Sequence, residues 1–404
     1  MKKVLVPKVR FKGFSEDWKE ERLLNFIEYK NGRAHENFVS KHGEYILVNS
    51  KFISSEGMSI KKFLKTSQYY QKNTITLVLS DIPNGKALAK TFIIPKDNTY
   101  ALNQRIAGLT IKKGIDLHFI NKTINRNPYF LRLDDGINQT NLNINQIKNM
   151  RFYTTDISEQ QKIGKLLDQI SNLITLEQSK LNKLKQLKQT LLQKMFPEHN
   201  SKKPRIRFRG FDEKWKEERL ENITKRMSSG GTPSTTIKKF YNGKIPFLTI
   251  SDMTKVGKYI NNTEKNITPE AIENSSTWLV PKNSLLLSMY ASFGKTAINK
   301  KEITTSQAIL GIILNNNISV EFLYYLLFLM DINQYWYKQV ETGTQPNLSN
   351  WTVSKTLIKL TKNISEQQKI GDFFSNIDTL INLYNSKLNK LKQIKEALLQ
   401  KMFV

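Results

Sequence analysis

The chain has no cysteine and only four histidines among its 404 residues. The absence of cysteine excludes a disulfide scaffold, a thiolate-bound zinc site and thiol catalysis. No two of the histidines have the spacing of metal ligands on a helix, so a histidine-based metal site is not expected either. The four are His35, His42, His118 and His199.

Long apolar runs are also missing. The nearest approach to one, Phe322 to Met330, has nine residues and includes two tyrosines, whereas a membrane-spanning helix needs roughly 18. The charged N-terminus is not followed by the apolar segment of a signal peptide. We therefore expect an intracellular protein that does not contact a membrane.

Positive charge dominates the composition instead. Lysine and arginine number 63 against 35 aspartates and glutamates, so the formal net charge is +28. Such a charge attracts polyanions, most obviously nucleic acid. The chain is also rich in lysine, asparagine and isoleucine together, and this bias is the alternative source of the charge. Charge alone therefore favours a nucleic-acid partner without establishing one.

An internal repeat organises the chain. Residues 7–26 and 204–223 are identical at 13 of 20 positions, and residues 157–196 and 364–403 at 27 of 40. Two copies are too few for a solenoid. We predict a monomer with pseudo-twofold internal symmetry.

The 40-residue repeats have the pattern of long helices, with apolar residues in one stripe and most lysines outside it. Ser158 and Ser365, each with a glutamine three residues later, match a capping box at the helix start. A helix of about 60 Å is too long to be buried by one small domain, so we predict that the two helices pair in an antiparallel coiled coil. The predicted seam contains Ile163, Ile170, Leu184, Leu191, Ile370, Ile377, Leu391 and Leu398.

Two blocks, roughly residues 27–156 and 224–363, lie between the repeats and match one another poorly. Short β-type runs separated by turn signals predict mixed α/β domains, while Trp18 and Trp215 in the repeats are expected to be core anchors. The fold class is therefore α+β, with two α/β domains separated by two long helices. The predicted strands are Tyr45–Val48, Thr74–Leu79, Thr91–Ile94, Ile106–Ile111, Ile245–Ile250, Ser284–Tyr290 and Ala308–Leu314, with a helix at Val320–Met330. The predicted boundaries are 1–156, a helix at 157–196, a linker at 197–206, a second domain at 207–363 and a helix at 364–404.

Duplicated scaffolding with two diverged blocks, on a basic protein, suggests a reader of two-part DNA sequences. This layout resembles the specificity subunit of type I restriction-modification systems over essentially the whole chain. The order and spacing of short fragments carry the resemblance, together with the helix that follows them. The first half has Asn31-Gly-Arg, Asn49-Ser-Lys, Gln104-Arg-Ile-Ala-Gly and Gln139-Thr-Asn-Leu, but lacks the Gly-Thr-Pro opening. The second half has Gly230-Gly-Thr-Pro-Ser, Tyr241-Asn-Gly-Lys-Ile-Pro-Phe, Ser292-Phe-Gly-Lys-Thr-Ala, Thr305-Ser-Gln-Ala, Gly343-Thr-Gln-Pro-Asn-Leu and Ile364-Ser-Glu-Gln-Gln-Lys-Ile.

The resemblance implies that each α/β block is a target-recognition domain that reads one half of a bipartite, asymmetric site on double-stranded DNA. It implies that the two helices set the spacing between the halves and dock two methyltransferase subunits, and that the larger assembly recruits two restriction subunits. Adenine N6 methylation with S-adenosylmethionine, and cleavage driven by ATP and Mg, would belong to those partners, so this chain would bind no cofactor. Such a complex would serve host defence in the bacterial cytoplasm, on the nucleoid when bound to DNA.

The residues agree that catalysis lies elsewhere. The chain lacks the Asn/Asp-Pro-Pro-Tyr/Phe tetrad, and its nearest string is Ser80-Asp-Ile-Pro. Phe293-Gly-Lys-Thr ends like a phosphate-binding loop, but the first glycine of that motif would fall on Met289. We expect a non-catalytic subunit.

DNA contacts are expected from polar, turn-flanked segments of the two blocks, because lysine and arginine bind phosphates while arginine, lysine, amides and hydroxyls read base edges. Gln104 and Asn141 have equivalents in the second half, Gln307 and Asn347, which favours a structural role for them. The candidates in the first block are Arg33, Ser50, Lys51, Lys86, Gln104, Arg105 and Asn141. Those in the second are Arg226, Thr235, Lys239, Ser251, Asp252, Tyr290, Lys295, Gln345 and Asn347.

Two other functions fit the same composition. One is a stand-alone regulator that binds a DNA sequence tightly without a partner. The other is a coiled-coil adaptor that bridges proteins, whose charge is incidental and which would show no salt-sensitive affinity for DNA.

Overall fold

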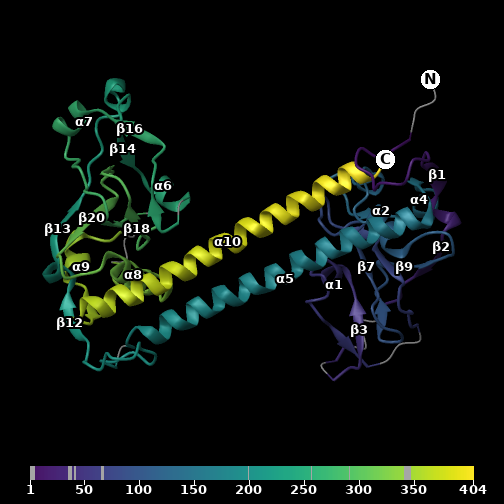
Figure 1. Ribbon diagram of the computed structural model, residues 1–404, viewed down its shortest axis with the longest axis horizontal. Helices are drawn as coiled ribbons and strands as arrows, with labels where there is room; N and C mark the ends of the chain where they lie inside the picture. Colours follow the sequence, from purple (N-terminus) through teal and green to yellow (C-terminus); the bar gives the residue numbers. More distant parts are fainter. Residues whose placement is uncertain are drawn as a thin grey trace. The chain divides into compact units, whose positions relative to one another are not determined.

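The computed structural model describes residues 5–34, 39–40, 42–64, 68–198, 200–255, 257–290, 292–340 and 347–404. The chain forms two compact units, unit 1 of Met1–Gln178 with Lys387–Val404 and unit 2 of Ser179–Ser386. The division runs through two long helices, α5 (Ile157–Met195) and α10 (Ile364–Met402), each of 39 residues (Figure 1). Each unit therefore joins one α/β block to parts of both helices.

Unit 1 is built on an antiparallel four-stranded sheet in the order β2-β9-β5-β7. A smaller sheet, β4-β3-β8, and two two-stranded pairs, β1-β11 and β10-β6, complete its strands in the described part of the chain. The strands are β1 (Lys19–Arg22), β2 (Ile27–Asn31), β3 (Tyr45–Val48), β4 (Lys62–Phe63), β5 (Ile75–Val78), β6 (Ser80–Asp81), β7 (Thr91–Ile93), β8 (Tyr100–Leu102), β9 (Ile106–Ile111), β10 (Thr140–Asn141) and β11 (Arg151–Thr154). The shorter helices are α1 (Ser50–Ser54), α2 (Leu117–Ile124), α3 (Pro128–Leu131) and α4 (Ile144–Lys148), with a 3-10 turn at Leu23–Asn25.

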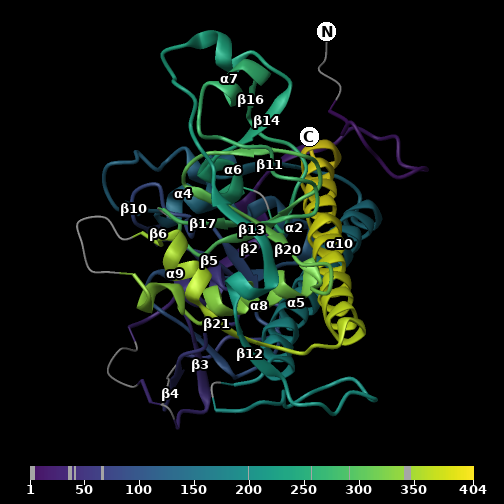
Figure 2. The same cartoon turned by 90° about the vertical axis from the view of Figure 1, so that its left-hand side faces the viewer.

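Unit 2 is built on a five-stranded sheet in the order β13-β20-β17-β18-β15, with a smaller sheet β16-β14-β19 and the pair β12-β21. Figure 2 labels β13, β17 and β20 of the large sheet and β14 and β16 of the smaller one. Helix α8 packs on the large sheet beside β18. The strands are β12 (Lys216–Arg219), β13 (Thr224–Ser229), β14 (Ile245–Leu248), β15 (Tyr259–Ile260), β16 (Lys265–Ile267), β17 (Leu285–Ser288), β18 (Thr296–Asn299), β19 (Thr304–Thr305), β20 (Ile309–Leu314) and β21 (Leu357–Leu360). The shorter helices are α6 (Ile250–Lys255), α7 (Pro269–Glu273), α8 (Val320–Ile332) and α9 (Asn350–Lys355), with 3-10 turns at Leu220–Ile223, Lys238–Tyr241 and Trp336–Lys338.

The strand and helix patterns read from the sequence are present in both blocks, and α+β content is confirmed. Trp18 and Trp215 are buried as expected, each in the main core of its unit. In unit 1 the core also takes in Leu167 of α5 and Met402 of α10. Both long helices therefore contribute to the core of the unit in which these residues lie.

Two side-chain contacts recur in both units at equivalent positions. In unit 1 Arg10 donates to the Glu159 carboxylate from two nitrogens, at 2.8 and 2.9 Å, and in unit 2 Arg207 does the same to Glu366, at 2.6 and 2.9 Å. Both carboxylates are fully buried. The charge-assisted pairs fix the segment before β1 or β12 against the first turn of the following long helix.

Glycine is required at one position in the first part of each long helix. A Cβ on Gly164 would lie 2.9 Å from the backbone nitrogen of Phe119 in α2, and one on Gly371 would lie 3.0 Å from that of Phe322 in α8. These contacts are with backbone atoms, which cannot swing away as a flexible side chain can. The glycines therefore allow α2 and α8 to approach the long helices closely.

The predicted capping boxes at the long helices are wrong. Ser158 and Ser365 are the second residues of their helices rather than N-caps. The cap is the residue before the helix: Asp156 accepts a hydrogen bond from the Ser158 backbone nitrogen at 2.8 Å, and Asn363 accepts one from Ser365 at 3.0 Å. An Asp or Asn side chain at this position satisfies N–H groups that the first turn leaves without a helical partner.

Candidate nucleic-acid interface

In unit 1 the strand pairing gathers several predicted DNA-binding residues at one end of the large sheet. The Leu79 nitrogen donates to the Arg105 carbonyl at 2.9 Å, and the Leu142 nitrogen donates to the Leu79 carbonyl at 2.7 Å. Arg105 and Asn141 therefore lie on either side of the strand end at residue 79, and both side chains are exposed. Gln104 lies beside Arg105, and Lys86 lies in the loop that follows β6. Both side chains are exposed.

The remaining unit 1 candidates are attached to the same region. The Arg33 nitrogen donates to the Leu102 carbonyl at 2.9 Å, and the Asn103 nitrogen donates to the Val48 carbonyl at 3.0 Å, just before α1. Ser50 and Lys51 open that helix, which Asn49 caps through the Phe52 nitrogen. We name the unit 1 tip as the surface formed by Arg33, Ser50, Lys51, Gln104, Arg105, Asn141 and the loop 81–87 that carries Lys86. Ser50 is half-buried, and the other named side chains are exposed.

Unit 2 has a corresponding tip, formed by the same pattern of backbone hydrogen bonds at a strand end. The Met289 nitrogen donates to the Ala308 carbonyl at 2.8 Å, and the Leu348 nitrogen donates to the Met289 carbonyl at 2.9 Å. These contacts place Tyr290 and Asn347, both exposed, beside each other. Lys295 is close by, because its backbone nitrogen donates to Ser288 Oγ at 3.0 Å. Gln345 lies outside the described residues.

Of the two candidates on α6, one faces outward and one inward. Ser251 is exposed, near the Ser306 nitrogen that donates to the Leu248 carbonyl at 3.0 Å. Asp252 is buried, and its carboxylate accepts hydrogen bonds from the backbone nitrogens of Thr249 at 2.9 Å and Glu264 at 3.0 Å. These bonds give Asp252 a structural part in shaping this segment.

Three unit 2 candidates are not brought to the tip by these contacts. Arg226 lies on β13 with its guanidinium 3.9 Å from the ring centroid of Trp278. Lys239 is exposed and forms an ion pair with Glu270 at 2.5 Å. Thr235 lines a hollow of about 580 Å³ beside the smaller sheet of unit 2. Since Trp278 lies far along the chain from Arg226, no local sequence signal indicates their stacking.

Sequence reasoning missed a side chain that completes the unit 1 tip. Gln139 is exposed, and its amide nitrogen donates to Ser80 Oγ at 2.6 Å, where β6 and β10 pair. The sequence carried a signal for it, since the string Gln139-Thr-Asn-Leu parallels Gln345-Pro-Asn-Leu in the other half.

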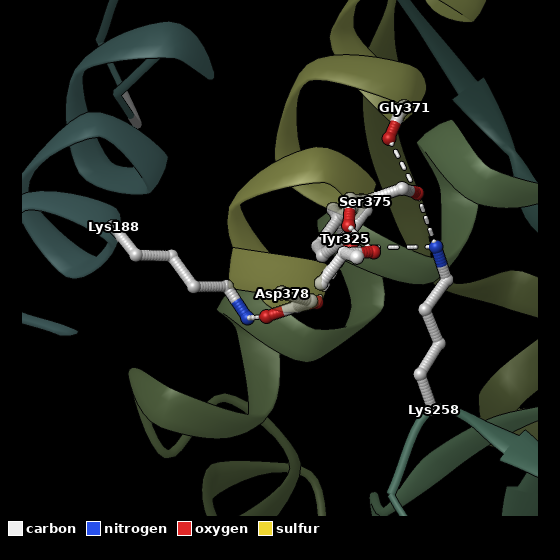
Figure 3. A network of polar contacts seen from close by, with 7 residues as sticks. Lys188, Lys258, Tyr325, Gly371, Ser375 and Asp378 are labelled. Carbon is white, nitrogen blue, oxygen red and sulfur yellow. Dashed lines mark hydrogen bonds and ion pairs between the residues drawn. The ribbon is translucent and has the colours of Figure 1, made fainter. Parts of the chain in front are cut away.

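A polar network attaches the unit 2 block to both long helices (Figure 3). Lys258, next to β15, donates to Ser375 Oγ of α10 at 2.6 Å and to the Tyr325 hydroxyl of α8 at 3.3 Å. Tyr325 in turn donates to Asp378 at 2.6 Å, and Lys188 of α5 binds the other oxygen of that carboxylate. Burial lowers the pKa of Lys258 to about 8 and raises the pKa of Tyr325. Four elements are thus held by one set of hydrogen bonds around Asp378.

In unit 1 other residues attach the α/β block to the long helices. Lys122 of α2 forms an ion pair with Asp168 of α5 at 2.7 Å, and His118 contacts the other oxygen of that carboxylate. Lys395 of α10 occupies the position equivalent to Lys188, and burial lowers its pKa. The acid is one helical turn earlier than in unit 2, because Asp168 corresponds to Ser375 in the repeat.

The predicted seam residues are distributed between buried and half-buried positions. Ile163, Ile370 and Ile377 are buried, whereas Ile170, Leu184, Leu191, Leu391 and Leu398 are half-buried. Leu181 and Leu388, which occupy equivalent repeat positions outside the predicted seam, are more deeply buried than those five. Ion pairs cross between the helices within each unit, Glu177–Lys387 at 3.1 Å in unit 1 and Lys188–Asp378 in unit 2.

Each unit also leaves three large apolar side chains of the long helices exposed at equivalent repeat positions, and Ile157 at the start of α5 is exposed as well. In unit 1 they are Leu173, Leu176 and Ile394, and in unit 2 they are Leu380, Leu383 and Leu187. Each member of one set is 207 residues from its equivalent in the other. We name these sets the exposed apolar triads.

Among the described residues no three His, Cys, Asp or Glu side chains cluster as a metal site would require. Within the same ranges, no helix is long and apolar enough to cross a membrane.

Comparison with known proteins gives one family match, to the Type I restriction modification DNA specificity domain, at residues 15–186 and again at 212–393. The chain is 32% identical over 192 residues to the type I restriction enzyme MjaIX specificity subunit of Methanocaldococcus jannaschii, an alignment that covers 47% of this chain and 44% of that protein. It is 27% identical over 172 residues to the EcoR124I/EcoR124II specificity subunit of Escherichia coli, covering 41% of this chain and 42% of that protein. The chain thus spans less than half the length of each of these curated relatives in the alignments.

Solved structures show a similar fold. The type I restriction-modification S subunit from M. genitalium matches with a TM-score of 0.66 at 18% identity, over 99% of both chains. A chain from a structure of the type I R-M system matches with a TM-score of 0.51 at 15% identity, over 95% of this chain and 97% of that one. At these identities the likeness concerns the fold alone.

Proposed function

Because the chain belongs to the family of the type I restriction modification DNA specificity domain, which matches it twice, we propose that it is the DNA-recognition subunit of a type I restriction-modification complex. Each unit reads one half of a bipartite, asymmetric site. The observation that carries the proposal is the pair of tips. Arg105 and Ala308 accept the same backbone hydrogen bond in their units, yet their side chains differ completely. Equal backbones with different side chains are what two readers of different sequences need.

The two long helices form an antiparallel coiled coil with pseudo-twofold symmetry in this proposal, and its length sets the spacing between the half-sites. The contacts inside each unit support the antiparallel direction. In unit 1, Leu167 near the start of α5 shares a core with Met402 at the end of α10. In unit 2, Leu192 near the end of α5 shares a core with Ile370 near the start of α10.

The exposed apolar triads are the docking sites for two methyltransferase subunits. Their exposure on long helices gives apolar surface for a partner, and their equivalence in the repeat supplies two similar sites. Two restriction subunits join through the larger assembly. Leu176→Asp and Leu383→Asp should each weaken binding of a purified methyltransferase subunit. Ile60→Ala, at an exposed apolar position away from the long helices, is the control.

Catalysis and cofactors belong to the partner subunits. The purified chain should show no methyltransferase, nuclease or ATPase turnover and no S-adenosylmethionine binding, because its sequence lacks the corresponding motifs. Turnover or binding by the chain alone would contradict this assignment. The complex works in the bacterial cytoplasm, on the nucleoid when bound to DNA.

Methylome sequencing of strains in which one block has been replaced tests whether each unit reads one half-site. Replacing one block should change one half of the methylated sequence, and replacing the other block should change the other half. Because Ser375 and Asp378 of α10 and Asp168 of α5 contact the blocks, each swap should extend into the following helix, over 27–168 or 224–378, which leaves the exposed apolar triads unchanged. A swap that altered both halves, or neither, would contradict the two-reader proposal.

A deletion strain and a DNA-binding assay at several salt concentrations separate this function from the alternatives. A stand-alone regulator would bind its sequence tightly without a methyltransferase and leave the methylome unchanged on deletion. An adaptor would show no salt-sensitive affinity for DNA.

A further inference from the structure

Two isoleucines of unit 1 are exposed beside the predicted DNA-reading residues. Ile82 and Ile137 are 68% and 80% exposed, although isoleucine is among the residues most often buried. Their loops touch, because Asn84 Nδ2 donates to the Gly136 carbonyl at 3.3 Å. Between the two loops β6 pairs with β10, which contains Asn141 of the unit 1 tip. The isoleucines therefore belong to one surface.

The two loops are built to hold these side chains outward. Asp81 Oδ1 accepts a hydrogen bond from the Ile82 nitrogen at 2.9 Å, and Asp135 Oδ1 accepts one from the Ile137 nitrogen at 2.9 Å. The other Asp81 oxygen accepts the Ala87 nitrogen at 2.6 Å, closing the first loop. The carboxylates are thus engaged with their own loops, and the isoleucines are preorganised for a contact.

The surroundings of the isoleucines identify the contact. Side-chain amides lie on both loops and beside them, and Lys86 and Arg105 supply positive charge. In the major groove an amide side chain pairs with the edge of adenine, and the methyl group of thymine accepts apolar contact. An A·T pair presents both features. The amide residues are Asn84, Asn138, Gln139 and Asn141. Their side-chain nitrogens donate to protein oxygens, at 3.3, 3.2, 2.6 and 3.4 Å, so the exposed isoleucines are the feature that points to thymine.

We propose that Ile82 and Ile137 contact thymine 5-methyl groups in the half-site that unit 1 reads. This rests on the proposed function and goes beyond it by naming two specificity-determining residues and the base they recognise. Unit 1 therefore reads a half-site that contains A·T pairs.

Replacing thymine by uracil, which removes only the methyl group, tests the contact. The probes are a duplex with the sequence methylated by the assembled complex, and the same duplex with uracil in the half assigned to unit 1 by the block swap. Binding of the full-length chain is measured by fluorescence anisotropy. We expect uracil to weaken wild-type binding about fourfold for each contacted methyl group, from the free energy of burying one such group.

Alanine variants, measured with both duplexes, complete a double-mutant cycle between protein and DNA. Ile82→Ala and Ile137→Ala should each bind the uracil duplex as wild type does and lose part of the difference between thymine and uracil. Ile60→Ala, at a residue that is 53% exposed and lies before β4, should keep the whole difference. Lys86→Ala should weaken binding to both duplexes equally.

Three results would overturn the inference. Equal wild-type affinity for both duplexes, with clear preference over a scrambled duplex, would exclude the methyl contact and leave the proposed function intact. Alanine variants that lose a methyltransferase subunit but keep their DNA affinity would assign the isoleucines to a protein interface. Absence of any sequence preference would overturn the proposed function, and this inference with it.

Discussion

Replacing Arg207 by methionine should lower the free energy of unfolding of unit 2 by about 3–5 kcal/mol, the usual cost of leaving one buried charge without its partner. Glu366 is fully buried and receives both Arg207 contacts, at 2.6 and 2.9 Å. Arg207 also donates to the Glu213 carbonyl at 2.7 Å. Its removal therefore leaves a carboxylate without compensation and frees the segment before β12.

The assay is urea unfolding of the full chain followed by circular dichroism, with the m value compared among variants. The set is Arg207→Met, Glu366→Leu and the double variant. The double variant should be more stable than either single variant, because two apolar side chains can replace a buried ion pair at little cost. Arg10→Met makes the matched test in unit 1, since Arg10 binds Glu159 in the same way at 2.8 and 2.9 Å.

A loss below about 1 kcal/mol for Arg207→Met would refute the reasoning, because that is the range of an exposed pair. A double variant whose loss equals the sum of the single losses would refute it as well, since independent sites add in this way.

Three further predictions concern the long helices and their contacts. Gly371→Ala should cost about 1–3 kcal/mol of unfolding free energy by overpacking against α8, whereas Gly257→Ala, with nothing within 4 Å of the new atom, should change little. Lys258→Met should flatten the pH dependence of the free energy of unfolding. In the wild type the folded-state pKa of about 8 lies below the ordinary 10.5. Between these two values the unfolded chain binds more protons than the folded chain, so wild-type stability rises with pH. Leu184→Asp and Leu391→Asp should each lower the melting temperature by placing a charge at the half-buried seam; an unchanged melting curve for both would count against a seam at these residues.

Local patterns predicted the secondary structure well. The strand at Ile106–Ile111 has the predicted bounds, and the helix predicted at Val320–Met330 begins at Val320 and ends two residues later than predicted.

The helix caps were predicted less well. Serine and glutamine at the right spacing indicated a cap at Ser158, but Asp156, two residues earlier, takes that place. A cap depends on where the backbone turns out of the helix, and the residue types alone do not fix that point.

The candidate interface was harder to predict from the sequence, because the position of a residue on the surface depends on contacts between distant segments. Arg105 and Asn141 are both polar and turn-flanked, and only the pairing of Leu79 with its two neighbours shows that they share one surface. Asp252 has the same sequence character, yet its carboxylate turns inward to backbone nitrogens. Ile82 and Ile137 were not predicted, because an isoleucine in a sequence is ordinarily assigned to a core.

The sequence by itself determined the duplication, the two long helices and the basic character of this protein, because identity between segments, periodicity and net charge are properties of the order of residues. The tertiary structure alone decided which side chains meet: the buried Arg–Glu pairs, the network around Asp378 and the two polar tips. Each of these joins segments far apart in the chain. The physical reason is that burial and hydrogen-bond partners are set by the packing of whole elements against one another, and local residue type limits this packing without specifying it.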